Sequence, residues 1–255
     1  MFTFDGSETT EPENAHFNLF PRYCSCPEGQ AEQQADYKQS LYDDWIAEAR
    51  QIIKSLELGK RKTYRFSTWE KERQSPNSLD VFNTVEKYTN HVTTKQTKKW
   101  LWLTGSYGLG KTHLGVAALR KIGADMLKSI LMVPWPEYCT AIQESWNEDK
   151  GDKPSFAAMK RAGVLLLDDI DKSTATTWAI QKLYEVIDYR SDREKITIIT
   201  ANHTIEQLRF EWNQISSIRD KAAAALSRID GQLYAQVVFT GKDQRQNVPS
   251  YRAMR

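Results

Sequence analysis

The sequence predicts a three-layer α/β/α protein in which a central parallel sheet of five strands lies between two layers of helices. Short apolar runs alternate along the chain with segments whose apolar residues recur at helical spacing. The apolar runs are nearly continuous, which is typical of parallel strands covered by helices on both faces. We expect strands at residues 100–104, 129–133, 164–167, 196–200 and 234–239, and helices at 79–92, 113–121, 136–146, 156–161, 176–192 and 217–229.

The length of 255 residues and the hydrophobic content of 40% allow one sizeable α/β domain and a smaller appendage. We assign the main domain to residues 61–255 and a small, partly helical N-terminal region to residues 1–60. Residues 1–38 are polar and contain three prolines, so we expect them to be largely irregular. Residues 41–58 carry apolar side chains at spacings of three and four, which predicts an amphipathic helix.

The formal charge of +2 is distributed unevenly along the chain. Residues 1–40 hold seven acidic and two basic side chains, a net charge of −5, which leaves +7 for the remainder. A basic body with an acidic tail is compatible with nucleic-acid binding but does not require it.

The sequence carries no sign of a membrane or secretory protein. It has no apolar run near 18 residues, and its first residues lack a basic segment followed by a long apolar stretch. Three cysteines in a chain of this size do not make a disulfide framework. We therefore expect a soluble cytoplasmic protein.

Residues 105–112 fit the phosphate-binding pattern G-x-x-x-x-G-K-[ST] at every fixed position, between an expected strand and an expected helix. Glycines let backbone N–H groups approach phosphate oxygens, and the N-terminus of the following helix favours negative charge. Lys111 is placed to reach the β- and γ-phosphates of ATP, and the Thr112 hydroxyl to ligate Mg²⁺. The alternative is a glycine-rich turn with a chance lysine. We predict a nucleotide-binding segment formed by Gly105, Ser106, Tyr107, Gly108, Leu109, Gly110, Lys111, Thr112 and His113.

Asp168 and Asp169 directly follow the apolar run 164–167. Ligands of open α/β sheets bind at the carboxyl ends of the strands, where these two acids would emerge. We expect Asp168 to hold Mg²⁺, directly or through water, and Asp169 to orient or deprotonate the attacking water. The alternative is an acidic cap at the start of a helix.

Two further polar residues are candidates for the same chemistry. Asn202 follows the strand at 196–200 and would point its amide at the γ-phosphate and the attacking water, although a turn-forming asparagine is the alternative. Arg228 closes an alanine-rich helical stretch, where it either acts on the γ-phosphate of a neighbouring subunit or simply complements the helix dipole.

Four segments follow one another along the chain, namely Gly105–Thr112, Leu166–Asp169, Ile199–Asn202 and Leu226–Ile229. In this order they resemble the AAA+ ATPases, and within them the DnaC-type helicase loaders and the related IstB-type transposition helpers. The likeness covers about residues 61–246 and includes further matching residues. These are Tyr64–Thr68, the run Asp168–Lys172 with the helix that contains Trp178, and Gly241–Arg245.

The resemblance implies a P-loop AAA+ fold and an ATP–Mg²⁺ site between subunits, with Arg228 as the finger into the neighbour. It also implies self-association into a ring or spiral, single-stranded DNA binding, and a replicative DnaB-type helicase as client in a bacterial or phage-infected cell. Residues 1–60 would then dock the helicase, with Trp45 as a natural anchor.

Two features depart from the broader AAA+ pattern. Most members carry Asp-Glu where this chain has Asp168-Asp169. The shorter side chain of Asp169 favours an ATPase that hydrolyses ATP slowly, as a molecular switch, over one that works as a motor. Only residues 240–255 follow the last expected strand, so we expect no C-terminal helical lid. Arg245 either contacts nucleotide or caps the sheet, and the sequence does not choose between these.

Zinc is not expected. Cys24 and Cys26 resemble the second half of a zinc ribbon, but a structural zinc site needs four ligands and only His16 lies nearby. For DNA, the candidate surface combines charged residues with nearby aromatic ones, and none of them is assigned a DNA contact. They are Lys150, Lys153, Lys160, Arg161, Trp135 and Tyr138.

The leading hypothesis is an ATP-dependent loader of a replicative helicase. The runner-up is an ATPase helper of DNA transposition of the IstB type, which would remodel duplex DNA. A small-molecule P-loop kinase would need an acceptor pocket and a lid, and a regulator that binds ATP without turnover would fit the shorter Asp169.

Overall fold

The computed structural model describes residues 61, 63–69, 77–145, 156–172 and 175–243. The helix expected at 41–58, the cysteines at positions 24 and 26, the lysines at 150 and 153, and Arg245 lie outside these residues.

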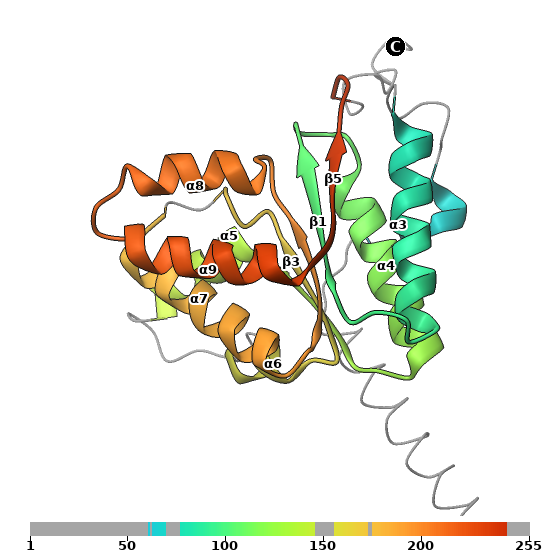
Figure 1. The fold of residues 1–255 in the computed structure, drawn as a ribbon, viewed down its shortest axis with the longest axis horizontal. Coiled ribbons are helices and arrows are strands. Elements are labelled where there is room, and N and C mark those ends of the chain that lie inside the picture. Colours follow the sequence, from blue (N-terminus) through green and yellow to red (C-terminus); the bar gives the residue numbers. More distant parts are fainter. Residues whose placement is uncertain (1–60, 62, 70–76, 146–155, 173–174, 244–255) are drawn as a thin grey trace, which may run out of the picture. The chain divides into compact units, whose positions relative to one another are not determined.

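Five strands form one parallel sheet in the order β2-β3-β4-β1-β5 (Figure 1). Their bounds are β1 Trp100–Gly105, β2 Ile130–Pro134, β3 Val164–Asp168, β4 Ile196–Thr200 and β5 Leu233–Phe239. The sequence prediction of a central five-stranded parallel sheet is therefore confirmed, and each expected strand agrees to within one residue at either end.

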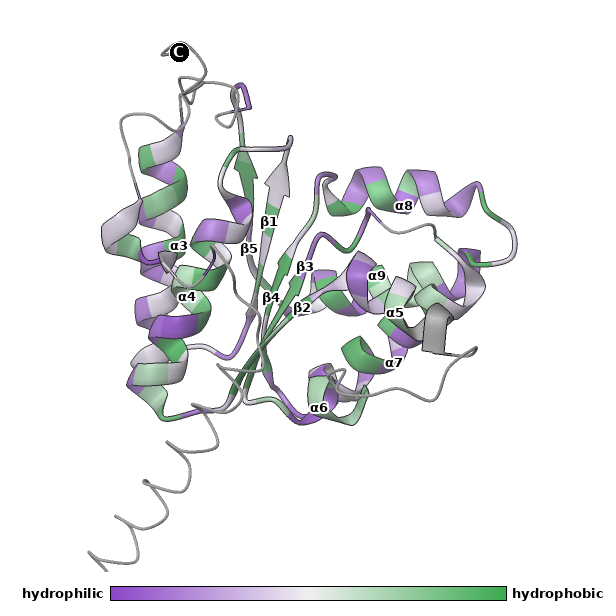
Figure 2. Ribbon diagram, turned by 180° about the vertical axis from the view of Figure 1, so that it is seen from behind, coloured by the Kyte–Doolittle hydropathy of each residue, from purple (hydrophilic) through white to green (hydrophobic). Residues whose placement is uncertain are grey.

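Helices cover both faces of the sheet, as predicted. One face carries α3 (Ser78–Thr93) and α4 (Lys111–Met126). The other carries α5 (Trp135–Ser145), α6 (Phe156–Arg161), α7 (Thr177–Asp192), α8 (Ile205–Asn213) and α9 (Arg219–Gln232). Figure 2 shows the apolar strands between these two layers. None of the helices in the described part of the chain is both long and apolar enough to cross a membrane.

The two cores follow from the alternation of side chains along β1. Trp100 and Trp102 point into the core beneath α5 to α9, whereas Leu101 and Leu103 point into the core beneath α3 and α4. All four side chains are fully buried. β1 therefore lies between two apolar layers, and the phosphate loop continues from its carboxyl end to α4.

A buried arginine ties the second layer to the sheet. Arg190 of α7 is fully buried and donates to the carbonyl oxygens of Met159, Ala162 and Ile196 at 2.9, 2.8 and 2.6 Å. Its Nε also donates to the Thr197 hydroxyl at 2.9 Å. These bonds satisfy a charge that would be costly to bury alone, and they fix the segment that leads into β3.

Helix α8 was not among the helices expected from the sequence. Its N-terminus is a capping box, because the Thr204 hydroxyl accepts from the backbone N–H of Gln207 at 3.2 Å and the Gln207 side chain accepts from the backbone N–H of Thr204 at 2.8 Å. Ile205, Leu208 and Trp212 are the buried side chains of the helix. The T-x-x-Q signature was present in the sequence and would have identified this helix.

The region after β5 does not test the expectation that no helical lid follows the sheet, because residues 244–255 lie outside the described residues, and the expectation stays a prediction. Within the described residues that follow Phe239, which end at Asp243, there is no helix.

Candidate nucleotide-binding site

The phosphate loop connects β1 to α4 through three glycines with positive φ. Gly105, Gly108 and Gly110 have φ values of 135°, 73° and 88°, a region that side chains disfavour. A Cβ on Gly105 would also lie 2.2 Å from the carbonyl oxygen of Phe239 on the neighbouring strand β5. Helix α4 begins at Lys111, so its positive end faces the loop.

Lys111 is held across the loop by three acceptors. Its Nζ donates to the carbonyl oxygens of Gly105 and Ser106 at 2.6 and 2.9 Å, and to Oδ1 of Asn202 at 3.0 Å. Only 6% of the residue is exposed, and this burial lowers the pKa of its ammonium group. The structure thus brings Lys111 and Asn202 into contact, although they are separated by 91 positions in the sequence.

Thr112 and Asp168 form a second contact between the loop and the sheet. The Thr112 hydroxyl donates to Oδ1 of Asp168 at 2.9 Å, and the Thr200 hydroxyl donates to the same oxygen at 2.7 Å. Burial, and next the charge of Asp169, raise the pKa of Asp168, while the two hydroxyl groups oppose this rise. Arg61 lies 3.9 Å from the other carboxylate oxygen.

This pair of oxygen donors is of the kind that Mg²⁺ uses. Mg²⁺ commonly takes one or two protein oxygens, with waters and substrate phosphates completing its shell. Thr112 and Asp168 fit that requirement through the nature and proximity of their oxygens. Among the described residues there is no group of three His, Cys, Asp or Glu side chains that could form a metal site of the structural type.

Asp169 is fixed by its backbone and paired through its side chain. Its φ is 58°, in the left-handed region, and its N–H donates to the Thr200 hydroxyl at 2.8 Å. Its carboxylate forms an ion pair with Lys172, whose Nζ also lies 4.9 Å from the centre of the Tyr107 ring. The acidic side chain expected to act on water is thus in contact with a lysine of its own loop.

A buried aspartate orients the segment that carries Asn202. Oδ2 of Asp171 accepts from the backbone N–H groups of Asn202 and His203 at 2.7 and 2.9 Å, and lies 2.9 Å from Nδ1 of His203. Only 1% of the Asp171 side chain is exposed. Asp171 therefore links the loop after β3 to the loop after β4, a role that sequence reasoning did not assign.

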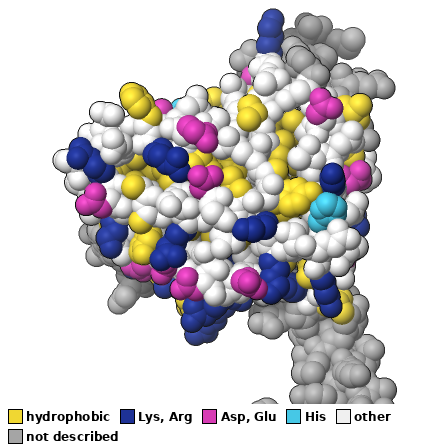
Figure 3. Space-filling view, in the orientation of Figure 1, with side chains coloured by type: hydrophobic (Ala, Val, Ile, Leu, Met, Phe, Trp, Pro, Cys, Tyr) yellow, Lys and Arg dark blue, Asp and Glu magenta, His cyan; other side chains and the backbone are white. Residues whose placement is uncertain are grey.

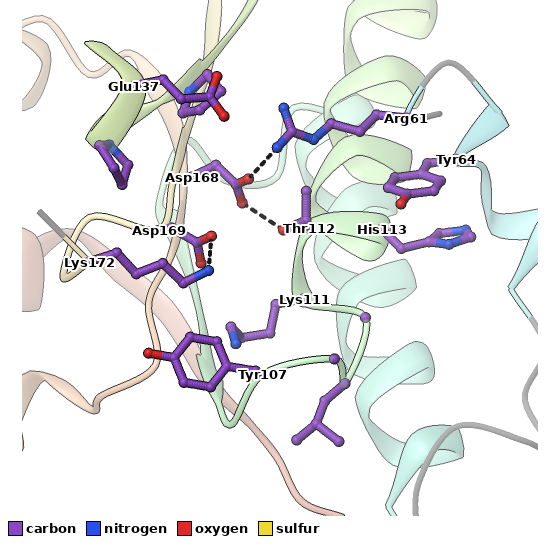
Figure 4. Close-up of a pocket in the computed structure, with 15 residues that line it drawn as sticks. Arg61, Tyr64, Tyr107, Lys111, Thr112, His113, Glu137, Asp168, Asp169 and Lys172 are labelled. Carbon is purple, nitrogen blue, oxygen red and sulfur yellow. Dashed lines mark hydrogen bonds and ion pairs between the residues drawn. The ribbon is translucent and has the colours of Figure 1, made fainter. Parts of the chain in front are cut away.

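Several of these residues line a pocket of about 630 Å³ (Figure 4). The volume lies within the range of small-molecule sites. Of the expected site residues, Tyr107 to His113, Asp168 and Asp169 line the pocket, whereas Gly105, Ser106 and Asn202 are not among the lining residues. The pocket is also lined by residues to which sequence reasoning assigned no role in binding, namely Arg61, Tyr64, Pro134, Pro136, Glu137 and Lys172.

The segment before the main sheet packs against the start of α4 through His113. The rings of Tyr64 and His113 are stacked, with centroids 4.4 Å apart and planes at 8°. Nε2 of His113 lies 3.0 Å from the carbonyl oxygen of Arg65, and the Trp69 ring meets the imidazole edge-on at 5.4 Å. Burial lowers the pKa of His113, and the contact with the Arg65 carbonyl opposes this. His113 thus anchors residues 61–69 beside the phosphate loop.

Arg228 lies away from these residues. The prediction that Arg228 closes its helix is wrong, because α9 continues to Gln232. Its guanidinium forms ion pairs with Asp188 at 2.6 Å and Asp192 at 3.8 Å, both on α7. Arg228 is not among the residues that line the pocket of its own chain.

The aromatic residues considered for DNA are buried. Trp135 and Tyr138 are 1% and 6% exposed and stack on each other in the core, so they cannot serve as a base-stacking platform. Lys160 lies over the Phe156 ring at 4.5 Å. Basic and acidic side chains are interspersed over the face seen in Figure 3, which shows no continuous basic stripe.

The phosphate loop after β1, the acids at the end of β3 and the sheet order together define an ATP-binding P-loop protein of the AAA+ class. The chain belongs to the family of IstB-like ATP-binding proteins, whose characteristic sequence it matches over residues 80–247. The resemblance drawn from the sequence is confirmed.

Two relatives come from Bacillus subtilis. The replicative helicase loader DnaI is 25% identical over 173 residues, which span 67% of this chain and 55% of DnaI. The phage-like element PBSX protein XkdC is 30% identical over 116 residues, 44% of this chain and 42% of the relative. The chain thus spans about half the length of these relatives.

Solved structures show the same fold. The crystal structure of DnaI superposes with a TM-score of 0.58 at 23% identity, covering 71% of this chain and 93% of that one. The crystal structure of the DnaC helicase loader gives a TM-score of 0.54 at 22% identity, with 71% and 99% covered.

Proposed function

We propose that this protein is an ATPase that binds ATP with Mg²⁺, assembles on single-stranded DNA and delivers a replicative DnaB-type helicase. The observation that carries the ATPase part is the convergence of Lys111, Asn202 and Asp168 at the carboxyl edge of the sheet. Lys111 begins α4 after the loop that leaves β1, Asp168 ends β3 and Asn202 follows β4. Because β3, β4 and β1 are neighbours in the sheet, the proximity of these residues depends on the fold and not on local sequence.

In the proposed reaction the loop N–H groups and Lys111 hold the β- and γ-phosphates. Thr112 and Asp168 would hold Mg²⁺, which would supply positive charge to neutralise the phosphates. Asp169 accepts a hydrogen bond from the attacking water, and Asn202 orients that water against the γ-phosphate. Asn202 is not among the pocket-lining residues, but its Oδ1 accepts a hydrogen bond from Lys111, which does line the pocket.

In this proposal Arg228 acts as an arginine finger, which reaches the γ-phosphate of ATP bound to a neighbouring subunit. An arginine that lies outside the pocket of its own chain can reach a γ-phosphate only in an assembly. Turnover would then depend on ring or spiral formation. We assign helicase docking to residues 1–60 and ATP binding to residues 61–255, in the cytoplasm of a bacterial or phage-infected cell.

ATP turnover measured with and without single-stranded DNA tests the proposal. We expect DNA to stimulate turnover, and both Lys111→Ala and Arg228→Ala to reduce it by at least about a hundredfold. Arg193→Ala is the control, because Arg193 is an exposed arginine that also lies over a tyrosine ring, 3.9 Å from Tyr189, but follows the end of α7. Nucleotide binding without turnover would instead favour a regulator that binds ATP but does not hydrolyse it. Turnover that is independent of DNA and unchanged in Arg228→Ala would favour a small-molecule P-loop kinase.

The second candidate is an ATPase helper of DNA transposition. The family match over residues 80–247 favours it as much as it favours a loader. The two differ in the DNA that they bind. A helper would bind duplex DNA more tightly than single strands in a fluorescence anisotropy titration, and a loader would show the reverse preference.

A further inference from the structure

The pocket contains a second lysine in addition to Lys111. Lys172 lines the cavity, and its ammonium group pairs with the Asp169 carboxylate and lies over the Tyr107 ring. Figure 4 shows Lys172 and Asp169 extending toward the phosphate loop from the same side of the pocket. Two cations therefore approach the space in which the phosphates of ATP would lie.

Asp169 and Lys172 differ in how firmly they are held. The Asp169 backbone is fixed by its N–H bond to the Thr200 hydroxyl at 2.8 Å. The Lys172 backbone N–H donates to the Asp169 carbonyl at 3.1 Å, which closes a tight turn. Beyond that turn, Lys172 has a four-carbon stem and a side chain that is 32% exposed. The lysine ammonium group is thus the partner that can move.

The triphosphate of ATP is a stronger partner than Asp169 for this ammonium. A carboxylate carries one negative charge, whereas the terminal phosphate of ATP carries more and presents three oxygens. Lys172 also lowers the pKa of Lys111, so the two ammonium groups share one electrostatic environment. A ligand that satisfies Lys111 through its terminal phosphate would therefore also attract Lys172.

We propose that Lys172 exchanges Asp169 for the terminal phosphate when ATP binds, so that this lysine makes the site prefer ATP over ADP. The exchange would also free the Asp169 carboxylate for the attacking water. This inference rests on the proposed ATP site, but it concerns which nucleotide the site selects and not whether hydrolysis occurs.

The chain offers a closely matched control in Lys182. This lysine also pairs with an acid three residues away, Glu185 at 3.1 Å, and lies 4.7 Å from the Phe156 ring. Its side chain is 30% exposed, close to the 32% of Lys172, but it lies outside the pocket. Lys182→Met therefore removes the same charge and the same kind of contacts without touching the proposed site.

The experiment measures the affinities of the full chain for ADP and for a non-hydrolysable ATP analogue by calorimetry with Mg²⁺. We expect Lys172→Met to weaken analogue binding about tenfold while ADP binding changes less than twofold. Lys172→Arg keeps the charge and should retain most of the preference. Asp169→Asn removes the competing partner and should tighten analogue binding relative to ADP, and Lys182→Met should change neither affinity.

An equal loss for both nucleotides would show that Lys172 only supports the turn, and would overturn the inference. An unchanged affinity ratio in Lys172→Met would overturn it as well. Neither result would affect the ATP site itself, whereas failure of the unmodified chain to bind either nucleotide would remove the proposed function.

Discussion

Asp168 combines nearly complete burial with a carboxylate that the proposed function needs in its charged form. Burial and the neighbouring charge of Asp169 raise its pKa above the ordinary aspartate value of 3.8. A raised folded-state pKa contributes stability that is present below pH 3.8 and lost as pH rises through the raised value. Without Mg²⁺, the ionised side chain therefore lowers stability at neutral pH.

Asp168→Asn should raise the free energy of unfolding of the nucleotide-free protein at pH 7 by about 1 kcal/mol. The amide keeps an oxygen for the Thr112 and Thr200 hydroxyls but carries no charge. Thermal denaturation at several pH values checks this, and the gain should shrink as pH falls toward 4. The variant should also lose the stabilisation that Mg²⁺-ATP gives the unmodified chain, and a variant that is less stable at pH 7 would contradict this account of Asp168.

Sequence reasoning at the residue scale succeeded where a position follows directly from a strand end. Asp168 and Asn202 follow adjacent parallel strands, so their placement at one edge could be expected before the structure was known. The contacts of Lys172 and Arg61 could not be expected in this way. They depend on the direction of side chains in loops, on the left-handed backbone of Asp169, and on the path of the chain before α3.

At the scale of elements, the junction of β1 with the phosphate loop depends on a glycine. Gly105→Ala should destabilise the protein by at least about 2 kcal/mol, because its φ is 135° and the added Cβ would meet Phe239. Gly231→Ala is the control, since its Cβ would have no heavy atom within 4 Å, and helix propensity predicts a gain of about 0.5 kcal/mol. Chemical denaturation of both variants compares the two, and equal effects would contradict the role of Gly105.

Helix α8 supplies a second prediction at this scale. Thr204→Ala removes the side-chain half of the capping box and should cost about 1 kcal/mol of unfolding free energy, whereas Thr204→Ser keeps the hydroxyl and most of the stability. Denaturant titration measures both. A loss in Thr204→Ser as large as that in Thr204→Ala would assign the effect to the methyl group and not to the cap.

The elements differ in how readily they could be predicted. The strands and the helices α3, α4 and α7 have long apolar runs or several turns of periodic residues, and their types were evident in the sequence. Helix α8 has only nine residues, and its exposed Phe210, 71% accessible, interrupts the apolar pattern. Local capping, and not periodicity, was the signal in the sequence that could have identified it.

At the scale of the whole molecule, the central claim is that the ATP site is completed by a second subunit. Arg228 is paired with Asp188 and Asp192 in the structure of one chain. These are partly exposed ion pairs, which contribute little to stability and can be exchanged in an assembly. The proposal therefore requires that Arg228 leaves its acidic partners when a neighbour presents bound ATP.

The most direct test mixes Lys111→Ala with Arg228→Ala and measures ATP turnover on single-stranded DNA. Each variant alone should be inactive, since one lacks the phosphate-binding lysine and the other lacks the finger. In a mixed assembly, some sites combine an intact Lys111 with an intact Arg228 from the neighbour, so turnover should return to a fraction of the unmodified rate. No recovery on mixing, with both variants folded and able to co-assemble, would contradict a site shared between subunits.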